Sequence, residues 1–146
     1  MDIIIRKPRP EDIPHLIKMN DEFNGPGCTI ESIQDSLANN RSEIVLVAVH
    51  DGTAIGFVCG QMYRSVCYAD GQLGELMELF VYEKYRRSGI ATKLVQELER
   101  EFRENNVREI ILKTGIDNEA ARRFYERQNY EDYEEVVYYK DITNAM

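Results

Sequence analysis

A strand, a short connection and a long amphipathic helix follow one another between Leu73 and Phe102, and this unit limits the possible folds more than any other feature of the chain. The helix is predicted from apolar residues at strict four-residue spacing, namely Ile90, Leu94, Leu98 and Phe102. A further strand is predicted in "EIILKT", directly after the helix. A strand–helix–strand unit joins parallel strands, so the fold contains a parallel pair with a helix against it.

The segments before this unit predict a hairpin and two helices. The strands "EIVLVAV" and "AIGFVCGQMY" are joined by the turn "HDGT", which indicates an antiparallel pair. A first short strand lies in "DIIIRK". It is followed by a helix whose first turn holds Pro10, and by a second helix that opens at Thr29 with Ser32.

The segments after it predict one more helix and a closing strand. The helix lies in "GIDNEAARRFYERQ" and is capped by Asp117 or Asn118, and the strand lies in "EEVVYYKDI". The complete order predicts an α/β (α+β) fold, with a mixed sheet of about six or seven strands and about four helices on both of its faces. We expect residues 1–146 to form a single domain.

Charge and cysteine content narrow the classes of function. The 26 acidic and 18 basic residues give a net charge of -8, which argues against binding to duplex DNA and suits either a cationic partner or simple solubility. The three cysteines form no CxxC pair, and His15 and His50 lie far apart in the sequence. We therefore expect free thiols in a reducing cytoplasm and no metal site. No apolar run reaches membrane-spanning length and no signal-peptide core opens the chain, so we expect no membrane association.

The connection before the long helix carries two arginines and a glycine, in "RRSGIA" at residues 86–91. Positive charges are unfavourable at a helix start, because the macrodipole is already positive there. One reading is that the arginines are solvated and Gly89 forms a turn. The other is that an anion binds the helix-start amides, with a close backbone approach at Gly89 and charge-assisted bonds from the arginines. The spacing is neither that of a P-loop nor that of a dinucleotide fold.

Two motifs carry a family resemblance. "RRSGIA" resembles the Q/R-x-x-G-x-G/A signature of the GNAT acetyltransferases, and "NEAARRFYERQNY" is similar to the N-x-x-A-x-x-F-Y-x-x-x-G-F segment of the same family. The predicted element order is also the GNAT order, so the resemblance covers nearly the whole chain. It departs at Asn129-Tyr130, where the family has Gly-Phe, although Asn can adopt the same left-handed conformation. The resemblance implies a GNAT fold and acetyl transfer from acetyl-coenzyme A to an amine.

The resemblance also implies a coenzyme site. Amides at the start of the long helix would hold the pyrophosphate, and the main chain of Leu79 to Val81 would bind the pantetheine arm as an added strand does. Tyr125 is either a packed aromatic residue or, as the resemblance implies, the general acid that returns a proton to the coenzyme thiolate. The predicted coenzyme-binding residues are Leu79, Phe80, Val81, Arg86, Arg87, Ser88, Gly89, Ile90, Ala91, Thr92, Asn118 and Tyr125.

Two glutamates in "GELMELFV" are candidates for the general base that accepts the amine proton. A regular strand would place Glu75 and Glu78 on opposite faces, unless a bulge resets the alternation. Glu75 resembles the catalytic glutamate of the histone acetyltransferases in the family and is the predicted base, with Glu78 as second choice. Alternatively both bind substrate ammonium groups, or one reaches solvent. The ribosomal-protein branch carries a glutamate where this chain has Lys113, so that variant is not expected.

The predicted function is acetylation of a primary amine on a small polycationic substrate such as an aminoglycoside or a polyamine. The net charge, "EDYEE" and a stretch resembling the aminoglycoside N-acetyltransferases, "YADGQ…GELMELFV", favour it, with Asp70, Glu75 and Glu78 as the predicted substrate-binding residues. The alternatives are a protein N-terminal or lysine acetyltransferase and a non-catalytic acyl-coenzyme A-binding domain. We also expect a homodimer, with the closing strand packed across its interface.

Overall fold

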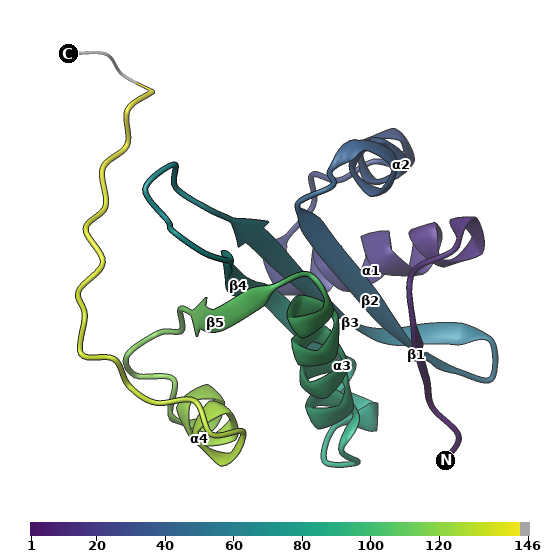
Figure 1. The fold of residues 1–146 in the computed structure, drawn as a ribbon. Helices are drawn as coiled ribbons and strands as arrows, with labels where there is room; N and C mark the ends of the chain where they lie inside the picture. Colours follow the sequence, from purple (N-terminus) through teal and green to yellow (C-terminus); the bar gives the residue numbers. More distant parts are fainter. Residues whose placement is uncertain (144–146) are drawn as a thin grey trace. The chain divides into compact units, whose positions relative to one another are not determined.

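The computed structural model describes residues 1–143, and the chain divides into two compact units, Met1–Lys113 and Thr114–Met146, which are described separately. The prediction of a single domain over 1–146 stays a prediction. Figure 1 shows the elements. In the first unit they are β1 Ile4–Arg6, α1 Ile13–Asn24, α2 Ile30–Asn39, β2 Glu43–His50, β3 Thr53–Tyr63, β4 Gln72–Val81, α3 Ile90–Glu104 and β5 Val107–Leu112. In the second unit the helix is α4 Glu119–Arg127.

The strands of the first unit form one mixed sheet in the order β1-β2-β3-β4-β5. Neighbours from β1 to β4 are antiparallel, whereas β4 and β5 are parallel and joined through α3, as the sequence predicted. The predicted hairpin turn between β2 and β3 is confirmed as well. Its central residues, Asp51 and Gly52, have φ angles of 48° and 77°, which a two-residue turn of this kind requires.

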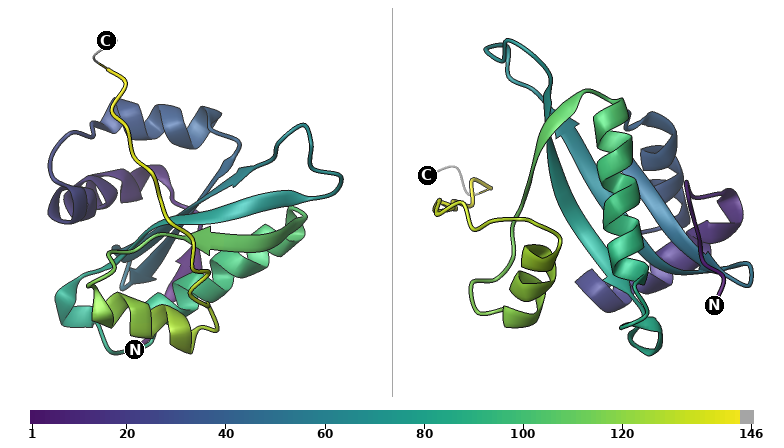
Figure 2. Two further views of the ribbon diagram at one scale, coloured as in Figure 1. Left: turned by 90° about the vertical axis from the view of Figure 1, so that its left-hand side faces the viewer. Right: turned by 60° about the horizontal axis from the view of Figure 1, so that its bottom comes forward.

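Helices cover both faces of this sheet, as predicted. Figure 2 shows α1 and α2 on one face and α3 on the other. The α3 stripe predicted from its four-residue spacing is buried at Ile90, Leu94, Leu98 and Phe102. On the opposite face the core cluster joins residues of α1 and the sheet, including Leu16, Met19, Val47, Phe57 and Phe80. None of the helices in residues 1–143 has the length and apolar character that a bilayer crossing requires.

Two glycines on the α3 face of the sheet allow the helix to pack closely. A Cβ atom at Gly60 would lie 2.5 Å from Cζ of Phe102 and 2.9 Å from Cδ1 of Leu98. A Cβ atom at Gly74 would lie 2.9 Å from Cγ1 of Val107 and 3.0 Å from Cε2 of Phe102. The Phe102 ring therefore occupies the space that side chains on β3 and β4 would otherwise fill.

The predicted closing strand in "EEVVYYKDI" is wrong, and the sheet described here has five strands rather than six or seven. Residues 130–143 belong to no helix or strand, and the apolar side chains after Tyr130 are exposed, with Val136 at 78% and Tyr138 at 92%. The β-branched and aromatic composition favours an extended backbone, but a strand also needs a neighbour to pair its N–H and C=O groups. No such neighbour is present among the described residues.

A buried carboxylate fixes the first strand to the turn before α1. Asp12, 1% exposed, accepts hydrogen bonds from Arg6 Nη1 at 2.6 Å and from the Arg9 amide at 2.7 Å. Burial by itself would raise the pKa of Asp12. The hydrogen bonds from Arg6 and Arg9 and the charge of Arg6 outweigh it, so this pKa lies below its ordinary value.

We expect Asp12→Asn to lower the free energy of unfolding by about 2 kcal/mol at pH 7, because it removes one partner of a largely buried ion pair. A depressed folded-state pKa stabilises the protein above the ordinary carboxyl pKa of about 4, and this stabilisation is lost as pH falls through the folded-state pKa. Urea unfolding at pH 7 and pH 3 measures both effects. Glu11→Gln in the same turn, which should change stability by about 0.5 kcal/mol or less, is the control. Equal stability of Asp12→Asn and wild type at pH 7 would contradict the assignment.

Candidate active site

Strand β4 carries both predicted carboxylates and has a bulge between them. Glu78 lies opposite Cys59 and Leu76 lies opposite Gly60, so Met77 has no partner on β3. The extra residue resets the alternation of side chains. Glu75 lies opposite Gln61, two residues beyond Cys59 on β3, so Glu75 and Glu78 project from the same face. The expectation of opposite faces for a regular strand is therefore wrong here, and the bulged alternative holds.

Glu78 lies on the sheet face that α1 and α2 cover. Its Oε1 accepts a hydrogen bond from Nδ2 of Asn24, at the end of α1, at 2.9 Å. Burial raises the pKa of Glu78, the Asn24 hydrogen bond lowers it, and the nearby charge of Glu43 raises it again, with a net rise above the ordinary value. A carboxylate of raised pKa is a stronger base, which suits proton removal from an ammonium group.

Glu75 has a different environment on the same face. Its Oε1 accepts a hydrogen bond from the hydroxyl of Tyr63 at 3.3 Å, and its Oε2 lies 3.5 Å from Nζ of Lys113. Both oxygens of Glu75 thus contact residues of the protein itself. Glu75 thus forms an ion pair with a lysine. Among the described residues, Glu78 forms no ion pair with a lysine or arginine, and its hydrogen-bond partner is the uncharged Asn24.

The outer edge of β4 is open beyond the bulge. The ladder with β5 ends at the pair Leu76 and Leu112, and within residues 1–113 no strand continues it. On the inner edge the amide of Tyr82 donates to Ile55 O on β3, so by alternation the main-chain groups of Leu79 and Val81 point to the outer edge. This is the arrangement expected for strand-like binding of an extended ligand, and the role predicted for Leu79 to Val81 stays a prediction.

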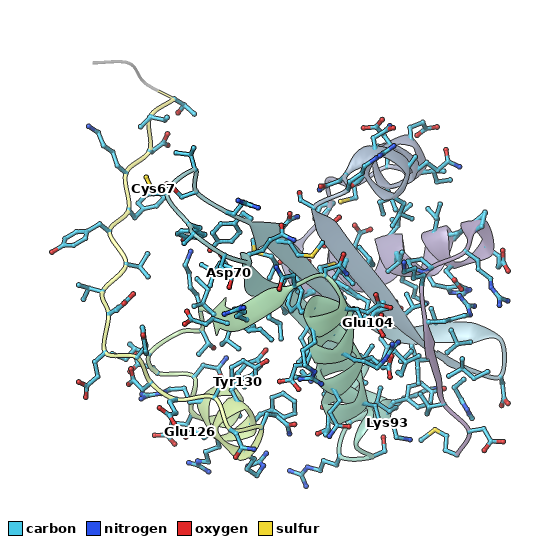
Figure 3. All side chains as sticks on the ribbon, viewed as in Figure 1. Cys67, Asp70, Lys93, Glu104, Glu126 and Tyr130 are labelled. Atoms are coloured by element: carbon cyan, nitrogen blue, oxygen red, sulfur yellow. The ribbon has the colours of Figure 1, made fainter. Side chains whose placement is uncertain are left out.

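The start of α3 is a candidate anion site. Arg87 and Gly89 both have left-handed backbone conformations, with φ angles of 64° and 81°, directly before the first helical residue, Ile90. Amides in the first turn of a helix have no intrahelical acceptor and point out from the helix end. A Cβ atom at Gly89 would have no neighbour within 4 Å, and residues 86–89 are exposed. Lys93 lies at this end of α3 and Glu104 at the other (Figure 3).

The two arginines of this loop differ. Nε of Arg86 donates to Val81 O at 2.7 Å, and its guanidinium lies over the Phe80 ring at 5.6 Å. Arg86 therefore anchors the loop to the end of β4. Arg87 is exposed. The predicted coenzyme-binding role of Arg86 stays a prediction, as do those of Phe80, Ser88, Ile90, Ala91 and Thr92.

Asn118 and Tyr125 belong to the second unit. Oδ1 of Asn118 accepts a hydrogen bond from the Ala121 amide at 3.1 Å, so Asn118 is the N-cap of α4, one of the two caps predicted. Burial raises the pKa of Tyr125 to about 12, so the phenol stays protonated at neutral pH, as a proton donor must. Asn129 has a φ of 70°, which confirms the left-handed conformation predicted where the family has glycine.

Asp70, a predicted substrate-binding residue, lies on the exposed loop between β3 and β4 (Figure 3). Its carboxylate forms an ion pair with Nη2 of Arg108 at 2.6 Å. The sequence reasoning did not identify Asn24, Tyr63 or Glu43 as neighbours of the two glutamates. These residues come from α1, β3 and β2, and no local motif marks them.

The fold, the open strand edge and the glycine-containing helix start define one class of protein. Residues 11–130 match the model of the acetyltransferase (GNAT) family, so the chain belongs to this family. The family and GNAT fold predicted from the sequence are confirmed. Acetyl-coenzyme A-dependent acetyl transfer, the chemistry predicted from the sequence, is the chemistry of this family.

Individual relatives extend this result. N-alpha-acetyltransferase 30 of Schizosaccharomyces pombe is 40% identical over 74 residues, which are 50% of this chain and 49% of the relative. Aminoglycoside N(6')-acetyltransferase type 1 of Acinetobacter baumannii is 31% identical over 84 residues, 58% of this chain and 53% of the relative. The matches thus span about half the length of these two proteins. The solved structure of AAC(6')-Iy with a bisubstrate analogue of coenzyme A has a TM-score of 0.83 at 20% identity, over 97% of this chain and 99% of that chain.

Proposed function

We propose that the chain is an enzyme that transfers an acetyl group from acetyl-coenzyme A to a primary amine of a small polycationic substrate, such as an aminoglycoside or a polyamine. The proposal rests on the arrangement at the carboxyl end of β4. Within residues 1–113 no strand pairs with the outer edge of β4 beyond Met77, where only the Val81 carbonyl is bonded, to Arg86, and the bulge turns Glu75 and Glu78 to one face. Family membership supports the coenzyme, and the two carboxylates support an amine acceptor. Acetylation of a protein N-terminus or lysine is the second candidate, favoured by the likeness to N-alpha-acetyltransferase 30.

The residues divide the proton transfers between them. Bound acetyl-coenzyme A would supply the thioester, at which a C–N bond to the amine forms and the C–S bond breaks. Glu78, directly or through one water, takes the proton that the substrate ammonium must lose before its nitrogen can attack. Tyr125 gives its proton to the departing thiolate, and the product is an amide and a free thiol. The raised pKa of Glu78 supports its role as the base, and the Tyr125 phenol carries a proton at neutral pH.

We expect Glu78→Gln to lower kcat/KM at pH 7 by about 10-fold. A larger loss is not expected, because Glu75 lies on the same face and can accept the proton through water. A raised pKa of the base places the acidic limb of the pH–rate profile above the ordinary glutamate range, and this limb should disappear in Glu78→Gln. Glu75→Gln is the matched variant and should keep the limb. If Glu75→Gln loses the limb and Glu78→Gln retains it, Glu75 is the base, as the sequence first indicated.

The class of acceptor can be tested with one substrate panel. We expect spermidine and an aminoglycoside to be acetylated, with kcat/KM falling as salt rises, because screening shortens the field of the carboxylates to about 8 Å at physiological ionic strength. Thiol release from acetyl-coenzyme A measures each rate at low and high salt. A preference for a short peptide N-terminus, with flat salt dependence, would instead support the protein-acetylating candidate. If no amine causes thiol release, the result would support the third alternative, a non-catalytic acyl-coenzyme A-binding domain.

Two further expectations belong to this proposal. We place the protein in the cytoplasm, which its free cysteines Cys28, Cys59 and Cys67 support. We also propose a homodimer, supported by the exposed apolar side chains of residues 134–142.

A further inference from the structure

A cavity of about 200 Å³ lies between the helices α1 and α2 and the face of the sheet that carries Glu78. Its walls are largely apolar, with Leu16 from α1, Ile33 and Leu37 from α2, and Val45 and Phe57 from the sheet. Sites for drug-sized ligands usually enclose 300–1,000 Å³ or so. This cavity is smaller, and it suits a single chain better than a group of linked sugar rings.

Helix α2 leaves part of its apolar stripe uncovered next to this cavity. The sequence predicted a stripe of Ile30, Ile33 and Leu37, yet no residue of α2 is buried, and Leu37 is 36% exposed. Ile33 and Leu37 line the cavity themselves. An alkyl chain in the cavity would cover this surface and remove it from water.

Two carboxylates lie among these apolar walls, on different strands. Val45, Cys59 and Glu78 lie opposite one another on β2, β3 and β4, and Glu43 lies two residues before Val45 on the same face. Glu43 and Glu78 are therefore separated by one intervening strand and offset by two residues along the strands, so their backbones are about 12 Å apart. Glu43 accepts a hydrogen bond from Oγ of Ser36 at 3.2 Å. No lysine or arginine is among the described residues that line the cavity.

We propose that this cavity binds an aliphatic diamine or polyamine, with Glu43 holding the distal ammonium group while the amine to be acetylated lies at Glu78. The apolar walls match a methylene chain, and the two carboxylates match ammonium groups at its two ends. An aminoglycoside carries hydroxyl groups along its whole length, and those facing Leu16, Ile33, Leu37, Val45 and Phe57 would have no hydrogen-bond partner on these side chains. This inference rests on the proposed function and narrows its substrate to the alkyl amines.

Glu43→Gln tests the inference when 1,4-diaminobutane is compared with butylamine, which has the same carbon chain and a single ammonium group. Wild-type kcat/KM should favour the diamine by about tenfold, the size of effect of one charge-assisted hydrogen bond. Glu43→Gln should bring the diamine to within about twofold of butylamine. The ratio of the two amines within each variant is the readout, because loss of the Glu43 charge also lowers the pKa of Glu78 and affects both amines alike. Glu31→Gln, on α2 but outside the cavity lining, is the matched control and should leave both substrates unchanged.

The outcomes separate this inference from the proposed function. An equal loss for both amines in Glu43→Gln, or no preference of the wild type for the diamine, overturns the role of Glu43. Acetylation of an aminoglycoside or peptide but of no alkyl amine also overturns it, while the proposed function stands. If no amine is acetylated, calorimetry of diaminobutane binding decides. Binding by wild type and Glu31→Gln that Glu43→Gln loses supports the site, and equal binding by all three proteins overturns it.

Discussion

Gly89→Glu is expected to weaken coenzyme A binding by more than 100-fold while the protein stays folded. The φ of 81° at Gly89 disfavours any other residue, at a cost of about 1–2 kcal/mol. A Cβ atom added at Gly89 would meet no protein atom within 4 Å. This position is where the pyrophosphate would approach the helix-start amides, and a carboxylate there would exclude it by volume and by charge. Isothermal calorimetry with coenzyme A measures the loss.

The chain offers a matched control for this variant at Gly52. Gly52 also has a left-handed backbone, with φ at 77°, and a Cβ atom added there would likewise have no neighbour within 4 Å. It lies in the turn between β2 and β3, outside the loop before α3. Gly52→Glu therefore adds the same charge and the same backbone strain, and it should bind coenzyme A like wild type. Wild-type affinity in Gly89→Glu would show that the coenzyme does not use this loop.

Tyr125→Phe is expected to lower kcat by about 100-fold and to change coenzyme A affinity little, because it removes the proton donor and keeps the ring. Burial raises the Tyr125 pKa to about 12, so the wild-type phenol remains protonated through pH 10. The pH–rate profile of the wild type should therefore show no loss of rate from deprotonation of Tyr125 up to about pH 10. Steady-state kinetics from pH 6 to 10 or so cover the relevant range.

The control for Tyr125 is Tyr133→Phe, which removes a hydroxyl from an exposed tyrosine of the same unit. Its kcat should equal that of wild type. A fully active Tyr125→Phe enzyme would return Tyr125 to a packing role, in contact with the rings of Phe124 and Tyr130 at 5.1 and 5.8 Å.

Features with local causes could be predicted from the sequence. Thr29 and Ser32 cap α2 through reciprocal hydrogen bonds of 2.9 and 3.0 Å, which depend only on residues three apart. Asn129 adopts the left-handed backbone that its side chain permits, and the α3 stripe follows from four-residue spacing. The order of the elements from β1 to α4 followed from the same local patterns and is also the order of the family.

The arrangement around the candidate base could not be predicted in the same way. The bulge at Met77 is a property of the register between β3 and β4, and nothing in "GELMELFV" marks it. The hydrogen bond from Asn24 to Glu78 joins residues 54 positions apart. The error at residues 134–142 has the opposite cause. Their local preference for a strand is clear, but a strand forms only where another strand is available to pair with it.

The close packing of α3 against Gly60 and Gly74 limits which substitutions this sequence can accept. The Phe102 ring, which touches both positions, lies about 18 Å along the helix from Ile90. A methyl group added at Gly60 would have to displace this ring or shift α3 as a whole, and a shift of α3 would also move its start at Ile90. These two glycines are therefore restricted by volume rather than by chemistry. An alanine at Gly60 or Gly74 could therefore disturb the candidate anion site at the start of α3, although neither glycine belongs to that site.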